Sequence, residues 1–319
     1  MQPSSTNGAF AYDINQVPDS DLALGSALAA SVPNPYYGHG GAGVVGSRTV
    51  TYAQLLRPFS EFGNIGILTN PSRARYNSAI VKAQKRMTAG LTFLSSLTWS
   101  KSMDNEFGSS NFFSGSSPYP QDAYNLAAEY SLSVYNTPLR WTNALSYQLP
   151  FGKGRAFLNH SRLLDAAFGG WQINIVNIFQ TGFPLAIYQS MNQNAILGTG
   201  VQRPNATGIS PAESGSVEQR LAHYINAAAF STAPSYSFGN LARTIPYRGP
   251  GIANWDTSLF KSFLITESVN AEFRAEALNT FNTPQFPNPN TQFGSAAFGT
   301  ITSQVNFSRM LQLGLRLSF

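Results

Sequence analysis

The 319-residue sequence predicts an all-β protein, and within that class an antiparallel transmembrane β-barrel segment: a partial barrel of about seven long strands with long extracellular loops. Three observations predict this class. Seven segments alternate apolar and polar residues with period two, the pattern of a strand that has one apolar and one polar face. The connections between these segments alternate between short and long. Charged residues make up only 11% of the chain, against roughly 25% in a soluble globular domain.

Composition excludes several other classes of protein. The 27 glycines, 19 prolines and 13% aromatic residues suit turns and strands rather than a helical bundle. Cysteine is absent, which excludes disulfides and thiolate metal sites. A net charge of +5 with 43% hydrophobic residues excludes a disordered chain. No stretch approaches the ~18–20 apolar residues of a membrane helix, so any crossing must be made by strands.

The strands are expected, in chain order, at residues 76–87, 91–101, 137–149, 170–181, 252–263, 269–281 and 307–319. The first and fifth segments are the least regular. On one face, the second, third and fourth segments place Leu91, Phe93, Leu97 and Trp99; Leu139, Trp141, Leu145, Tyr147 and Leu149; and Trp171, Ile173, Ile175 and Phe179. Each segment is long enough for the ~9–11 tilted residues of a membrane-crossing strand.

The last two segments show the alternation most clearly. In the sixth, an apolar face carries Val269, Phe273, Ala275, Ala277 and Phe281, opposite Asn270, Glu272, Arg274 and Glu276. In the seventh, one face carries Phe307, Arg309, Leu311, Leu313, Leu315, Leu317 and Phe319, opposite Ser308, Met310, Gln312, Gly314, Arg316 and Ser318. Both patterns predict a sheet with an apolar and a polar surface.

The gaps between those segments contain 3, 35, 20, 70, 5 and 25 residues. Unstructured loops longer than ~12–15 residues are uncommon in compact soluble domains. Outer-membrane barrels, by contrast, have short periplasmic turns and long extracellular loops. We expect the gap of 20 to hold a short periplasmic helix at 159–168, and loops 102–136, 182–251 and 282–306 to form an extracellular ligand surface. Residues 1–75 are expected to be a loop-like extracellular segment, and 76–319 the barrel strands.

Aromatic residues gather near the strand ends: Trp99, Trp141, Tyr147, Trp171, Phe179, Trp255, Phe263, Phe281 and Phe319. This placement fits the two interfacial girdles of a membrane barrel. The alternative is that aromatics favour strands in general and fill a soluble core. The alternation of loop lengths favours the barrel.

No residue pattern points to catalysis, to a cofactor or to nucleic acid. His39, His160 and His223 lack metal-ligand spacing and are expected at the surface. Glu272, Arg274 and Glu276 share one strand face, where we expect a hydrated charge ladder along the lumen rather than a catalytic pair. The 20 basic residues form no cluster, which disfavours a nucleic-acid partner.

Six segments carry a resemblance to a known family: RPFSEFGNIG (57–66), YNSAIVKAQKRMTAGLTFLSSLTWSKSMDN (76–105), LSYQLPFGKGRAFL (145–158), GGWQINIVNIFQTGFPLAI (169–187), RGPGIANWDTSLFKSF (248–263) and FRAEALNTFNTPQFPNPN (273–290). From about Gln54 to Phe319 the sequence resembles the C-terminal barrel of TonB-dependent outer-membrane receptors, and within them the Oar-like type common in acidobacteria. The resemblance implies energy-coupled ligand uptake in the bacterial outer membrane. It also implies four partners: the TonB complex, the barrel-assembly machinery, outer-membrane lipid and an unknown extracellular ligand.

A complete receptor of that family has about 22 strands around a plug domain. Seven crossings with a periplasmic C-terminus would leave the N-terminal segment outside the cell, whereas bacterial single-chain barrels have an even number of strands. The opening residues MQPSSTNGAF also lack the basic and apolar regions of a secretory signal. We therefore expect the chain to be a C-terminal piece of a longer receptor, with TonB engaged through the missing N-terminal part.

The resemblance also implies a role for the last strand. Leu311, Leu313, Leu315, Leu317 and Phe319 share one face and end on an aromatic residue, which fits the terminal signal that the barrel-assembly machinery reads by strand addition. The alternative is a terminal strand of a soluble sheet. For the whole protein, the rival function is an all-β surface adhesin or glycan-binding module without transport, in which the apolar face would pack on a second sheet.

Overall fold

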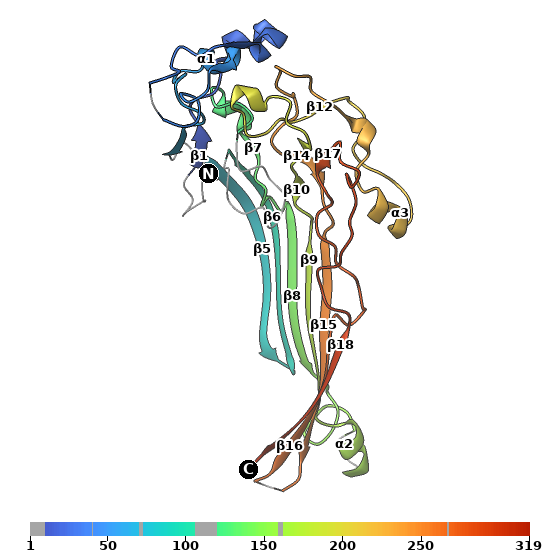
Figure 1. Cartoon of the computed structure of the whole chain (residues 1–319). Coiled ribbons are helices and arrows are strands. Elements are labelled where there is room, and N and C mark those ends of the chain that lie inside the picture. The colour runs from blue at the N-terminus through green and yellow to red at the C-terminus, as the bar shows by residue number, and fades with distance from the viewer. Residues whose placement is uncertain (1–9, 40, 70–72, 106–119, 159–161, 267) are drawn as a thin grey trace.

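The computed structural model describes residues 10–39, 41–69, 73–105, 120–158, 162–266 and 268–319. Figure 1 shows an elongated molecule in which long strands run side by side and short elements gather at one end, opposite the C-terminus. We name the long strands the wall. The short elements form the cap, which comprises the described residues within 10–73, 105–138, 181–251 and 279–309.

The wall contains all seven predicted strands, with ends shifted by a few residues. They are β5 (Ala74–Thr88), β6 (Leu91–Asp104), β8 (Leu139–Gln148), β9 (Trp171–Gln180), β15 (Ile252–Leu264), β16 (Asn270–Leu278) and β18 (Met310–Ser318). They pair antiparallel in the order β18-β16-β15-β9-β8-β6-β5, and β7 (Ser131–Leu132) pairs with the end of β6. Within the described residues no pairing joins β5 to β18, so the sheet is not closed. The predicted fold class is confirmed.

The strand register keeps each face of the wall uniform across six strands. One row of cross-strand partners is apolar: Leu313, Ala275, Leu259, Ile173, Tyr147 and Leu91. The adjacent row, on the opposite face, is polar: Gln312, Glu276, Ser258, Asn174, Ser146 and Thr92. A shift of one residue in any strand would mix the two rows, so the period-two pattern fixes the register.

The short connections lie at the end of the wall away from the cap (Figure 1). β5 and β6 are joined through Ala89 and Gly90, whose φ angles of 52° and 80° match a tight hairpin turn. A Cβ atom at Gly90 would lie 2.7 Å from the carbonyl oxygen of Gln148, so this position requires glycine. The connection between β8 and β9, also at this end, contains α2 (Arg162–Phe168), which confirms the described part of the predicted helix 159–168.

The C-terminal end of α2 meets the apolar face of the wall. Lys261, opposite Phe273 and Trp171 on that face, donates from Nζ to the carbonyl oxygens of Ala167 and Gly169 at the C-terminal end of the helix. The Trp171 indole donates to the same Ala167 oxygen over 2.9 Å. Because carbonyls at a helix C-terminus carry partial negative charge, they are suited to hold a cation that would otherwise face the apolar surface.

The cap consists of short elements. Those before the wall are β1 (Phe10–Asp13), η1 (Asp19–Ala29), β2 (Ser31–Pro33), β3 (Thr49–Thr51), α1 (Tyr52–Leu56) and β4 (Gly66–Thr69). Those in the long connections are η2 (Leu126–Glu129), β10 (Pro184–Leu185), β11 (Tyr188–Gln189), η3 (Ala195–Leu197), β12 (Asn205–Ala206), α3 (Val217–Ala222), η4 (Ala227–Ala229), β13 (Phe230–Ser231), β14 (Ile245–Arg248) and β17 (Gln292–Phe293). The predicted loop-like segment 1–75 thus carries regular elements in its described part.

Two hydrophobic clusters give the cap its own cores. The larger joins connections 181–251 and 279–309 through Leu185, Ile187, Tyr224, Ile225, Ala229, Phe230, Leu241, Ile245 and Ile301. The smaller packs Val17, Leu28 and Ala53 from the segment before the wall against Leu197 of connection 181–251. The long connections therefore fold together as one packed body.

Candidate functional site

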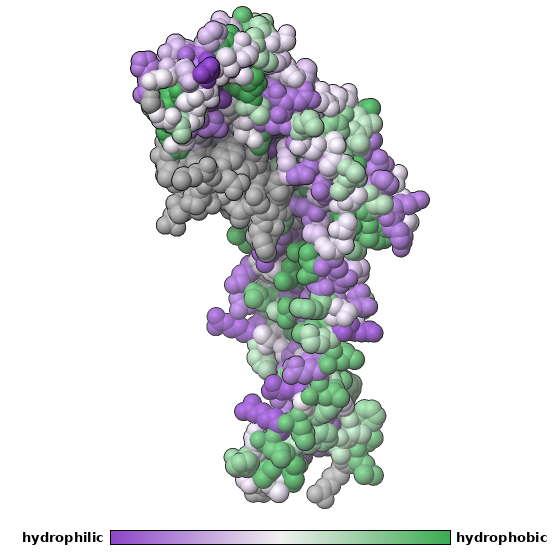
Figure 2. All heavy atoms as spheres, in the orientation of Figure 1, coloured by the Kyte–Doolittle hydropathy of each residue, from purple (hydrophilic) through white to green (hydrophobic). Residues whose placement is uncertain are grey.

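The predicted assembly residues lie along the exposed apolar face of β18. Leu311, Leu313, Leu315 and Leu317 are 71%, 72%, 71% and 56% exposed, and Phe319 directly follows the strand. Figure 2 shows hydrophobic side chains gathered at this end of the molecule, over β16, β18 and α2. In the described residues β18 pairs on one side only, with β16. Its other edge offers backbone groups for strand addition.

Aromatic residues form a continuous belt on the apolar face near the cap. Trp141 stacks on Phe179 with ring centroids 5.5 Å apart, Phe179 meets Trp255 at 5.8 Å, and Trp255 meets Phe281 at 5.8 Å. Near the other end, the Lys261 Nζ lies 5.3 Å from the Trp171 ring centroid and 5.0 Å from that of Phe263. Six of the nine predicted aromatics thus gather at two levels of the wall.

A polar pair interrupts the apolar face between these levels. Asn143 and Asn177 are cross-strand partners, and the Asn143 Nδ2 donates to the Asn177 Oδ1 over 2.7 Å. In the neighbouring strand pair, the Trp141 indole donates to the Ser95 hydroxyl over 2.9 Å. Sequence reasoning passed over Ser95, Asn143 and Asn177 because each interrupts an otherwise apolar stripe. Their shared signal is a polar residue at the same cross-strand position in three neighbouring apolar stripes, since Ser95 faces Asn143 and Asn143 faces Asn177. The apolar face tolerates these residues because each polar group hydrogen-bonds to another side chain.

The polar face carries the predicted charge ladder. Arg274 forms an ion pair of 2.6 Å with Glu272, and its guanidinium lies 4.8 Å from the centroid of the Phe260 ring. Glu272 is also the cross-strand partner of Arg316, so β16 and β18 place one pair of opposite charges side by side. Farther along the sheet, Asn174 donates to the Ser258 hydroxyl over 3.2 Å. This face is a hydrogen-bonded surface suited to contact with water.

The cap contains a buried charge cluster that sequence reasoning missed. Arg203 pairs with Glu129 at 2.6 Å, and Glu129 is fully buried. Arg243 pairs with Asp104 at the end of β6 and donates from Nε to the Glu129 carbonyl oxygen over 3.0 Å. Gln121 completes the cluster, since its backbone N–H donates to Glu129 and its side-chain oxygen accepts from the Arg203 N–H. The cluster ties a wall strand to two connections.

Burial lowers the pKa of the Arg243 guanidinium, and the neighbouring Asp104 and Glu129 carboxylates oppose that effect. Arginine nevertheless stays protonated in proteins, so Arg243 keeps its charge. The sequence carries only a weak signal of this cluster, because its members are isolated charges in a chain with few charges. Arg203 and Glu129, for example, are more than 70 residues apart. The cluster holds the cap together.

The predicted histidines do not converge. His39 and His223 are exposed, in agreement with the prediction, and His160 lies outside the described residues. Among the described residues, no three His, Asp or Glu side chains are grouped as a metal site would require. That same part of the chain has no helix of the length and hydropathy needed to cross a membrane.

Comparison with known proteins agrees with this geometry. A family model described as an outer membrane beta barrel domain matches residues 4–312. Searches of curated proteins and of solved structures gave no match. In outer-membrane barrels the apolar face contacts lipid and the polar face lines the lumen, which are the two surfaces that the wall presents. The chain belongs to the outer membrane beta-barrel domain family and is located in the outer membrane of bacteria.

Proposed function

We propose that the chain forms the C-terminal wall and part of the extracellular face of a TonB-dependent receptor of the Oar-like type. Such a receptor takes up an extracellular ligand with energy relayed from the inner membrane. The observation that carries the proposal is the combination of a polar-faced wall with a folded cap at one end of it (Figure 1). The quoted segments that resemble this receptor family support it further.

The cap is suited to bind a ligand because its connections are already ordered. Two hydrophobic cores and two buried ion pairs fix them, so less conformational entropy is lost on binding. Exposed tyrosines offer stacking faces and hydroxyl groups on the cap surface: Tyr37, Tyr124, Tyr130 and Tyr135. Oligosaccharides and peptides are the ligand classes that such a surface would recognise.

Transport can be tested in cells that produce the full-length protein. Labelled oligosaccharides and peptides would be offered to cells with and without TonB, and uptake into the periplasm measured. We expect uptake of at least one probe only where TonB is present, together with binding of the purified protein to the periplasmic domain of TonB. Surface binding without uptake, and without any TonB contact, would instead support an adhesin or glycan-binding module.

We propose further that the barrel-assembly machinery reads Leu311, Leu313, Leu315, Leu317 and Phe319 on the free edge of β18. Replacing Phe319 with Asp should then lower the amount of protein inserted in the outer membrane several-fold. Phe62→Asp is the matched control, because Phe62 is 56% exposed in the cap. Insertion is measured by surface proteolysis and heat-modifiable migration. Equal insertion of the two variants would contradict the proposed signal.

A further inference from the structure

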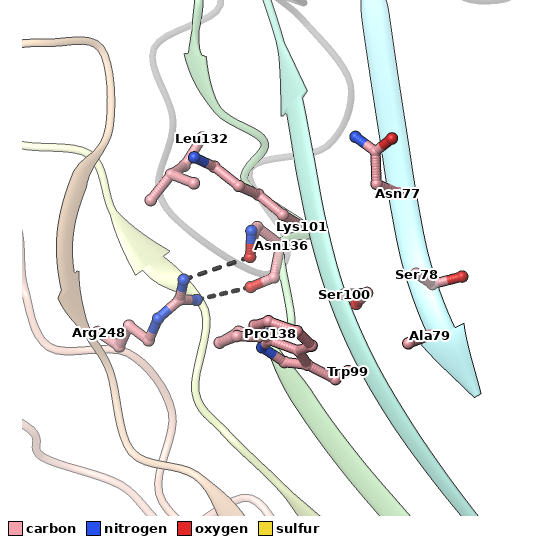
Figure 3. Close-up of a pocket in the computed structure, with 10 residues that line it drawn as sticks. All are labelled: Asn77, Ser78, Ala79, Trp99, Ser100, Lys101, Leu132, Asn136, Pro138 and Arg248. Atoms are coloured by element: carbon pink, nitrogen blue, oxygen red, sulfur yellow. Dashed lines mark hydrogen bonds between the residues drawn. The ribbon is translucent and has the colours of Figure 1, made fainter. Parts of the chain in front are cut away.

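A pocket of about 490 Å³ opens near the cap end of the wall (Figure 3). Its described lining comes from β5, β6, β7, the segment between β7 and β8, and β14: Asn77, Ser78, Ala79, Trp99, Ser100, Lys101, Leu132, Asn136, Pro138 and Arg248. Trp99 is 68% exposed although it is the largest side chain of the set. None of the functions considered above uses this pocket.

The pocket lies on the lipid-facing side. Ala79 is the cross-strand partner of Trp99 and Asn77 that of Lys101, on the same face as Leu97 in the apolar stripe of β6. Figure 3 shows the Lys101 side chain extending toward Leu132, whereas the Ser78 side chain points away from the pocket. An occupant would therefore arrive from the membrane side rather than from the lumen.

Its depth corresponds to the outer headgroup region. The aromatic belt crosses β6 at Leu97, the partner of Trp141. Trp99 lies two residues, or ~7 Å along the strand, closer to the cap than Leu97. Lys101 lies four residues, or ~13 Å, closer to the cap than Leu97, and both face outward. Because aromatic belts lie at the membrane interface, Lys101 is level with the charged groups of the outer leaflet.

Two cations, Lys101 and Arg248, line the pocket, and Arg75 lies two residues from the lining residue Asn77 on β5; none of the three has a carboxylate partner in the described part of the chain. Arg75, the partner of Met103, is diagonal to Lys101 on the same face. Arg248 donates to the Asn136 carbonyl oxygen over 2.7 Å and to the Gly182 carbonyl oxygen over 3.1 Å, and neither acceptor is charged. The described ion pairs are Arg203–Glu129, Arg243–Asp104 and Arg274–Glu272, so none of the three cations is neutralised there.

We propose that this pocket binds a phosphorylated glycolipid of the outer leaflet. Lys101 and Arg75 hold the phosphate by charge-assisted hydrogen bonds, and Trp99 packs against the first carbons of an acyl chain. A glycolipid is the occupant that the geometry selects, because the pocket combines an apolar wall, open to the membrane, with cations at headgroup depth. The inference rests on the outer-membrane location and does not depend on TonB or on transport.

Purified full-length protein in detergent would be titrated with diphosphoryl lipid A, with dephosphorylated lipid A and with inorganic phosphate. We expect the diphosphoryl form to bind tightest. One cation beside an anionic lipid surface contributes about fivefold in affinity, so Arg75→Ala/Lys101→Ala should bind diphosphoryl lipid A about thirtyfold more weakly. Lys82→Ala is the control: Lys82 lies on the polar face opposite Ser96, and its loss should leave binding unchanged.

Equal affinity of the double variant and the wild type would overturn the proposal, as would equal binding of the dephosphorylated lipid. Inorganic phosphate that displaces diphosphoryl lipid A at comparable concentration would show a small-anion site instead and would also overturn it. If the double variant fails to assemble, Lys101→Met alone should bind about fivefold more weakly. Native mass spectrometry of the wild type should then show one retained phosphorylated glycolipid, and its absence would count against the site.

Discussion

The wall and the cap satisfy their backbone hydrogen bonds in different ways. In the wall each strand pairs with its neighbours through a regular ladder. In the cap, buried amide side chains replace much of that ladder. Asn15 is fully buried, and its Nδ2 donates to the carbonyl oxygens of Phe59, Phe62 and Gly63 at 2.8, 3.1 and 2.7 Å.

Gln202 plays the same part in the longest connection. It is fully buried and donates to the carbonyl oxygens of Pro234 and Ser237, at 2.9 Å each, while its side-chain oxygen accepts from Gln189 and from the Gln193 N–H. Lipid offers no hydrogen-bond partners, so the backbone groups of the wall must pair with those of neighbouring strands. The cap lies outside the lipid and can keep an irregular backbone, provided that its buried polar groups find partners.

The largest expected effect is a loss of cap stability when a buried ion pair of the cap is broken. Arg203→Met leaves the fully buried Glu129 carboxylate without its ion partner, which costs about 3–5 kcal/mol when a buried pair is broken. We expect rapid proteolysis within the cap while the wall keeps its heat-modifiable migration. Arg220→Met, at an exposed site beside Tyr224, is the control and should cost under about 1 kcal/mol. A wall that unfolds together with the cap would show that the two are one cooperative unit.

The next effect separates the two faces of the wall. Ala275→Arg and Leu313→Arg place a cation on the apolar face, at a cost of about 2–4 kcal/mol near the bilayer midplane. Gln312→Arg lies on the polar face, where the new cation stays in contact with water. We expect it to cost no more than a lipid-facing cation costs at the membrane rim, about 0–1 kcal/mol. Urea unfolding in detergent or lipid gives the order. A reversed order would mean that the register of β18 is shifted by one residue.

A smaller effect concerns the buried amides of the cap. Gln202→Leu keeps the side chain's size but leaves the carbonyl oxygens of Pro234 and Ser237 without their donor. An unsatisfied buried group costs about 1–3 kcal/mol, and faster proteolysis of the cap would report it. Gln304→Leu, at an exposed position, should change stability by no more than about 0.5 kcal/mol. Equal susceptibility of the two variants would remove the structural role given to Gln202.

The smallest effect is on the pH dependence of the cap. Burial raises the pKa of the Asp122 carboxyl, although a hydrogen bond from the Tyr124 N–H opposes the shift. The folded state then binds more protons than the unfolded state between the ordinary and the raised pKa, so stability falls as the pH rises through that window. Asp122→Asn keeps the acceptor for Tyr124 and should flatten the profile of proteolysis against pH. A variant profile as steep as the wild type would assign the dependence to another group.

The wall could be predicted almost completely from the sequence. The leucines of β18 and the alternation in β16 specify strands and faces within a single segment, because a strand exposed to lipid on one side must repeat every two residues. The residues that the prediction passed over in the wall are those whose partner lies in another strand. Asn143 interrupts an apolar stripe until the register places it opposite Asn177.

The cap was not predictable in the same way. Phe293 falls in a segment predicted to be a loop, yet its ring lies 5.9 Å from Phe230 and 5.4 Å from Phe298 beside the larger core. Arg243 and Asp104 are 139 residues apart and meet only after connection 181–251 has folded against β6. Such contacts follow no period, because an irregular backbone can bring any two residues together. The sequence alone therefore determined the strands, the two faces and the membrane location, whereas only the tertiary structure decided which distant polar and aromatic residues hold the cap over the wall.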